Sequence, residues 1–213
     1  MLNTMVLPEG DETPTVPVVS KPIHIRVARL VSTIFSPITI SLPVIILIAL
    51  YHNEPSALLF AAITLFFLSI GPMLYILIGV SLGKFTDVDV SVRSQRTGPF
   101  LFSIVSSSLG FIILLLNHAP KNLQTVMLTT ILTGIIFMIV TFWWKISMHA
   151  SSLSGAVTML AVLYGRMVLP VYLLVVLVGW SRVVLKRHTI AQVTAGALVS
   201  IALTLAMLTL RGV

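Results

Sequence analysis

The chain has 213 residues, of which 57% are hydrophobic and only 9% are charged. This composition, with a mean hydropathy of +1.09, excludes an ordinary soluble domain and indicates an integral membrane protein with several spans. The net charge of +7 would suggest a nucleic-acid partner in a soluble protein, but here the cations lie at the ends of apolar runs, which favours membrane topology and anionic lipid headgroups and no nucleic acid.

The N-terminal thirty residues predict two short regions before the membrane. Residues 1–20 form a disordered polar tail, because they hold three prolines and three acids and lack the basic and apolar regions of a signal peptide. Residues 21–30 place Lys21, Arg26 and Arg29 among apolar residues, which is typical of a basic interfacial segment. Residues 31–213 are then a single transmembrane domain.

Apolar segments after residue 30 predict an all-α, polytopic transmembrane helical bundle of about seven spans. Gly98-Pro99 suits the start of the third segment, because proline is tolerated in the first turn of a helix. The sixth is short and carries Pro170 near its start. It is expected to tilt, to thin the bilayer locally, or to form one broken unit with the fifth, which would leave six spans. The segments are 31–51, 56–83, 99–116, 124–144, 147–165, 167–181 and 189–210.

The positive charges predict the orientation. With seven spans, ten lysines and arginines fall on the side of the N-terminus and three on the other side. The N-terminus is therefore expected in the cytoplasm and the C-terminus outside, in the plasma (inner) membrane, although cations kept for ligand binding would bias this count. In either orientation the loops around residues 84–98, 145–152 and 182–188 emerge on one face and can meet at one site.

Those three loops carry most of the residues suited to phosphate chemistry. Arginine side chains bind phosphate oxygens in pairs, and helix N-termini add N–H donors. Two histidines can take the two roles of a phosphoryl transfer: one attacks phosphorus and the other protonates the leaving oxygen. No metal or cofactor is then needed. The clusters are Asp87, Asp89, Arg93 and Arg96; Lys145, Ser147 and His149; and Ser181, Arg182, His188 and Gln192.

The order of these residues resembles the type 2 phosphatidic acid phosphatase superfamily of membrane lipid phosphatases and soluble haloperoxidases. The family's third motif, Ser-Arg-x5-His-x3-Asp, is matched by Ser181, Arg182 and His188 at the right spacing. Its second motif, Pro-Ser-Gly-His, is matched at Ser147 and His149. The first motif, Lys-x6-Arg-Pro, is matched only by its arginine, at Arg96. The resemblance covers roughly residues 85–200 and implies a phosphatase-like core there.

The resemblance also implies roles for single residues. His188 would be the nucleophile that forms a phosphohistidine, His149 the general acid, and Gln192 the group beside His188 that replaces the family's aspartate. The phosphate would be held by Arg96, Ser147 and Arg182, and Lys145 would supply a charge that the first motif lacks. One turn of helix separates His188 from Gln192, so the glutamine oxygen can accept a hydrogen bond from the imidazole and set its tautomer, without offering a negative charge.

The expected function is therefore a metal-independent hydrolase of lipid phosphates or isoprenoid diphosphates, acting in lipid metabolism. The departures leave a second interpretation open: Asp89 stands at the lysine of the first motif, Met148 at the glycine of the second, and Gln192 at the aspartate of the third. The alternative is a catalytically inactive, lipid-binding or accessory subunit of a membrane complex. Whether the chain forms a homo-oligomer or joins a larger membrane complex stays open.

Two further classes are disfavoured. A transporter driven by ions would need ionisable residues in mid-span, and almost none are present. A magnesium–diphosphate site like that of membrane prenyltransferases would need two acidic motifs, and half of the six acids lie in the tail. Lys186 and Arg187 are interpreted as cations that anchor the helix end at the interface.

Overall fold

Two short helices, α1 (Ile23–Ile34) and α2 (Pro37–Leu50), begin the part of the chain that the computed structural model describes, residues 22–51 and 53–213. The tail predicted at 1–20 lies outside this part, as does Lys21. Ser36 caps α2 by accepting a hydrogen bond from the backbone N–H of Thr39 at 3.3 Å, and Pro37 follows as its first residue. Because proline excludes a continuous helix here, α1 and α2 meet at an angle of 43°. The expected boundary between the interfacial segment and the first span, at residue 31, falls inside α1.

The next span combines three helical segments, α3 (Ala57–Leu65), the π-helical turn η1 (Phe66–Ile70) and α4 (Gly71–Ser81). The wide turn comes just before Pro72, which has no N–H to donate to the preceding turn. After a loop and the 3₁₀ turn η2 (Arg93–Gln95), two long helices follow and pack against each other, α5 (Thr97–Leu116) and α6 (Lys121–Thr141).

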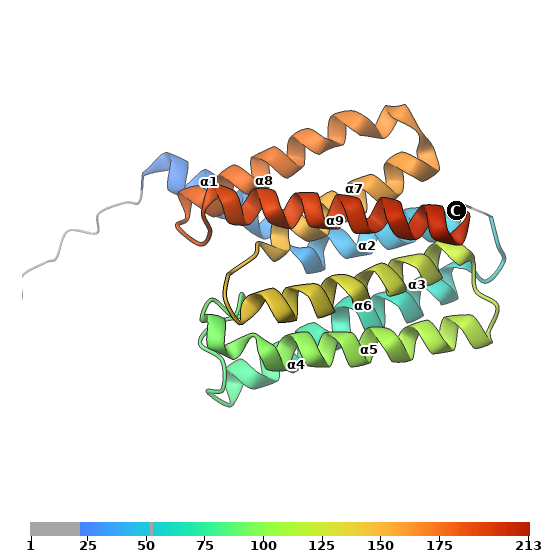
Figure 1. Ribbon diagram of the computed structural model, residues 1–213, viewed down its shortest axis with the longest axis horizontal. Helices are drawn as coiled ribbons and strands as arrows, with labels where there is room; N and C mark the ends of the chain where they lie inside the picture. The colour runs from blue at the N-terminus through green and yellow to red at the C-terminus, as the bar shows by residue number, and fades with distance from the viewer. Residues whose placement is uncertain (1–21, 52) are drawn as a thin grey trace, which may run out of the picture.

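The C-terminal part forms a helical hairpin and a final long helix. The hairpin consists of α7 (Met148–Tyr164), the 3₁₀ turn η3 (Arg166–Val171) and α8 (Tyr172–Val184). Gly165, at φ +80°, reverses the chain, so α8 returns beside α7 and α1 (Figure 1). The fifth and sixth apolar segments are thus two separate helices rather than one broken unit. The last helix, α9 (Ile190–Arg211), packs along α7.

The described residues form an all-helical bundle of an integral membrane protein. Five helical segments are long and apolar enough to cross a membrane, and the bent pair α1–α2 is a sixth if it counts as one span. Helix α7 has 17 residues and is shorter than these, so the count of seven stays a prediction. No strand occurs in residues 22–51 and 53–213.

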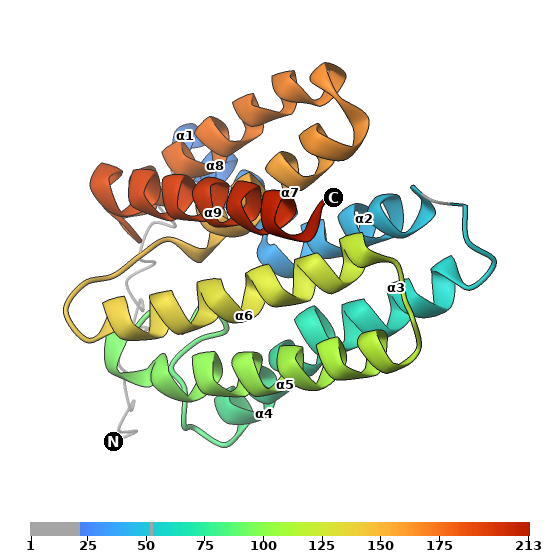
Figure 2. The ribbon, with the colours of Figure 1, turned by 45° about the vertical axis from the view of Figure 1, so that its right-hand side comes forward.

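Two groups of helices lie side by side, α3–α6 in one and α1, α2 and α7–α9 in the other (Figures 1 and 2). Buried side chains from both groups join in one apolar core, among them Ile48 of α2, Leu114 of α5, Met127 of α6 and Leu208 of α9. The loops after α4, α6 and α8 all lie at the end of the bundle away from the C-terminus (Figure 1). The three polar clusters therefore share one face, as the succession of spans predicts.

Candidate functional site

A cavity of about 960 Å³ reaches from the three loops into the bundle. Along α2 its wall runs from Ser36 to Ile48, which corresponds to about 18 Å of helix. The end near the loops is charged, and Arg96, His149, Arg182 and His188 all line it. The remaining wall is mainly apolar, with residues such as Val44, Ile45, Leu68, Met73, Val126 and Met159.

Three hydroxyl groups along this wall donate to carbonyls of their own helices. Ser41 Oγ donates to the carbonyl of Ile38 at 2.7 Å. Thr129 and Thr130 donate in the same way, at 2.8 and 2.9 Å, to carbonyls one turn earlier in α6. These three hydroxyls are therefore less available to an occupant, and apolar side chains make up most of the wall.

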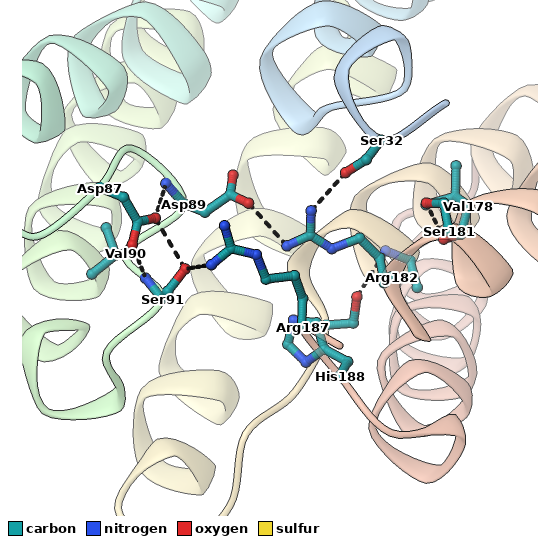
Figure 3. Close-up of polar contacts among 12 residues, drawn as sticks. Ser32, Asp87, Asp89, Val90, Ser91, Val178, Ser181, Arg182, Arg187 and His188 are labelled. Atoms are coloured by element: carbon teal, nitrogen blue, oxygen red, sulfur yellow. Dashed lines mark hydrogen bonds and ion pairs between the residues drawn. The ribbon is translucent and has the colours of Figure 1, made fainter. Parts of the chain in front are cut away.

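Arg182, in the last turn of α8, is the most deeply buried cation of the cluster, with 4% of its surface exposed. One terminal nitrogen donates to Ser32 Oγ at 2.6 Å and the other contacts Asp89 Oδ2 at 3.0 Å (Figure 3). Its Nε is buried and has no hydrogen-bond partner. The Nε–H therefore has no partner within the protein, and it lies on the edge of the guanidinium that also faces Asp89.

Two more arginines come from the loops beside α5 and α9. Arg96 is 7% exposed, and its Nε donates to the carbonyl of Val90 at 2.9 Å. Arg187 donates to the hydroxyl of Ser91 and lines the cavity (Figure 3). Sequence reasoning interpreted Arg187 as a surface anchor, because its neighbour across the site comes from a loop about a hundred residues away.

His188 and Gln192 make the contact that the i, i+4 spacing predicts. Gln192 Oε1 lies 3.2 Å from His188 Nδ1 and also accepts the backbone N–H of Thr189 at 3.2 Å, as part of a capping box at the start of α9. An atom that accepts from the backbone is the amide oxygen, so Nδ1 of His188 carries the hydrogen. The lone pair is then left on Nε2, the nitrogen that can attack phosphorus.

The electrostatic surroundings keep His188 neutral. Burial lowers its pKa to about 3, and the nearby charges of Arg182, Lys145 and Arg96 act in the same direction. The pKa of Lys145 is also lowered, by partial burial and by the same arginines. For Asp89, burial raises the pKa, but the attraction of Arg182 and other cations outweighs it and lowers the net pKa below its ordinary value.

The second cluster divides into two parts. His149, in the first turn of α7, is 7% exposed and lines the cavity with His188. Ser147 does not line it: the hydroxyl caps α7 by accepting the N–H of Ala150 at 3.4 Å and is fully buried. Lys145 is also absent from the cavity wall, although it acts electrostatically on His188.

Sequence reasoning did not foresee the contribution of α1. Arg29 and Ser32 line the charged end of the cavity, and Ser32 binds Arg182. The interleaving of cations and apolar residues in this helix suits an interfacial segment equally well, so the signal is ambiguous. Among residues 22–51 and 53–213, no group of three or more histidines or acids could hold a metal ion. No family model, curated protein or solved structure matches the chain.

Proposed function

We propose that this protein is a membrane phosphatase that acts on lipid phosphates or isoprenoid diphosphates through a histidine nucleophile, without a metal. One observation carries the proposal. Two histidines and two buried arginines, from segments far apart in sequence, line the charged end of a cavity whose remaining wall is apolar. A phosphorylated lipid has this distribution of charge and carbon.

The proposed reaction needs a neutral His188 as nucleophile and a protonated His149 as acid. Neutral His188 attacks phosphorus through Nε2, a P–N bond forms as the ester P–O bond breaks, and the leaving oxygen takes a proton from His149. The two negative charges of a bound phosphate favour the imidazolium form of His149 that this step needs. Water then gives a proton to His149 and attacks the phosphohistidine, which releases orthophosphate and restores His188.

The decisive measurement is phosphate release from a phosphatidate and from a prenyl diphosphate, in detergent micelles, with and without a chelator. His188→Ala should lower the rate by at least a hundredfold, and the chelator should have no effect. His24→Ala is the matched control, because His24 is exposed in α1 and does not line the cavity. Equal rates for the native chain and His188→Ala would refute the catalytic role.

The second candidate is an inactive lipid-binding or accessory subunit of a membrane complex. Two observations favour it: Gln192 offers no charge to an imidazolium, and all three arginines of the site already have partners in one loop. This candidate predicts a phosphorylated lipid that copurifies with the protein while neither the native chain nor His188→Ala releases phosphate.

A further inference from the structure

Three arginines, one before α5 and two from the end of α8 and the turn after it, bind the same five residues, 87–91, which we call the strap. Arg182 contacts the carboxylate of Asp89 at 3.0 Å, and Arg96 donates to the carbonyl of Val90 at 2.9 Å. Arg187 donates to the hydroxyl of Ser91. Figure 3 shows the strap facing Arg182 and Arg187 across the site. Arg96 and Arg182, the two arginines expected to bind phosphate, are therefore already engaged by the protein itself.

The strap is a preformed loop under strain. Asp87 organises it by accepting hydrogen bonds from the backbone N–H groups of Asp89 and Ser91, at 2.9 and 3.3 Å, and from the Ser91 hydroxyl at 3.0 Å. Val90 has a φ of +45° and is 4% exposed. A β-branched residue is disfavoured at positive φ, so tertiary contacts must hold this conformation in place.

The Asp89 contact uses only part of what Arg182 can offer to an anion. A carboxylate oxygen occupies one terminal nitrogen, while the adjacent Nε is buried without a partner. A phosphate can accept from Nε and the terminal nitrogen together, which is the bidentate geometry that guanidinium favours. A phosphate and the Asp89 carboxylate cannot share this edge, because both would need the same terminal nitrogen and their like charges repel.

We propose that Asp89 is an internal competitor for phosphate, and that a ligand binds only by displacing the strap from Arg182. This inference rests on the proposed function insofar as these arginines bind a phosphate. The strap lowers the apparent affinity for every anion by the fraction of time that the site is open. Anions with weak intrinsic affinity are thereby kept out at the concentrations they reach in the membrane.

The test is the affinity for dioctanoyl phosphatidate, measured by titration calorimetry in a His188→Ala background in which no turnover is expected. Adding Asp89→Asn should tighten binding about tenfold, a coupling typical of competing sites. Glu54→Gln is the control, since it removes one negative charge from an exposed residue that does not line the cavity. Arg182→Gln should weaken binding strongly.

The outcomes separate the two proposals. Binding that is unchanged in Arg182→Gln would overturn the phosphate site and with it the proposed function. Binding that needs Arg182 but is not tighter in Asp89→Asn overturns the competitor role alone.

A second measurement covers the case in which Asp89→Asn does not fold. The chain has no cysteine, so Val90→Cys adds a single thiol at a buried position of the strap. Phosphatidate should speed its reaction with a water-soluble maleimide, and an unchanged or slower reaction would contradict displacement of the strap.

Discussion

Gly196 of α9 provides a sharp test of how the two histidine-bearing segments are held together. A Cβ atom at this position would lie 2.7 Å from the backbone oxygen of Ser147 and 3.1 Å from Cγ2 of Ile146. Ordinary contacts begin near 3.4 Å, so alanine would push the helices apart by roughly 0.7 Å. A backbone oxygen cannot rotate away, and overpacking of this kind costs about 1–3 kcal/mol, offset by about 1 kcal/mol of helix propensity.

The same helix pair supplies the control. Gly155 of α7 faces the side chain of Ser200, whose Oγ would lie 2.7 Å from an added Cβ. This hydroxyl is at the end of a side chain and can turn to another rotamer, so Gly155→Ala should be neutral or slightly stabilising. The two variants make the same chemical change in one interface and differ in whether the obstructing atom can move.

Thermal unfolding of the purified protein in one detergent measures the difference. A net loss of up to about 2 kcal/mol in Gly196→Ala should lower Tm by up to about 8 °C for a chain of this size. The displacement also separates His188 from His149, so the proposed phosphate release should fall by about tenfold or more. A Gly196→Ala protein that melts at or above the native Tm, like Gly155→Ala, would refute the close backbone contact.

Three further outcomes are expected. NMR of histidine-labelled protein should show that His188 stays neutral well below pH 6.5, with the hydrogen on Nδ1, and that Arg182→Gln raises its pKa. Because the pKa of His188 is near 3 in the folded protein, the unfolded chain binds one more proton between pH 6.5 and 3. The stability of the fold should therefore fall as the pH drops through this range. Gln192→Glu places a negative charge beside His188, which should raise the pKa of His188 and speed phosphate release about tenfold. An unchanged or lower rate would count against the proposed nucleophile. Ser147→Ala should lower stability by about 1 kcal/mol through loss of the α7 cap, with KM unchanged; a rise in KM would instead assign the hydroxyl to the phosphate.

The features that the sequence predicts correctly are those that depend on hydrophobic periodicity and on local residue spacing. The lengths of the apolar segments place the three loops at one end of the bundle, and the four-residue spacing predicts the contact between His188 and Gln192. The capping box at Thr189 also depends on local spacing, but it was not predicted.

The remaining features depend on tertiary contacts that no local pattern records. Asp89 reads as a substitution in a motif, yet its position opposite Arg182 is set by a loop folded around Asp87. Ser147 occupies a motif position, but the start of α7 uses its hydroxyl as a cap. The span count is ambiguous for a related reason, because 17 residues of apolar helix suit either a short span in a locally thinned bilayer or a buried helix.

The carbon-rich lining beside α2 and α6 bears on the order of events in the proposed catalysis. Threonines that bond back to their own helices present methyl groups, so Thr129 and Thr130 should tolerate replacement by valine with little effect on lipid affinity. A substrate tail bound along some 18 Å of α2 would stay bound after the P–O bond breaks, because cleavage changes none of its apolar contacts. Release of the dephosphorylated alcohol, and not P–O cleavage, would then limit turnover. A substrate with a shorter tail should therefore have a higher kcat.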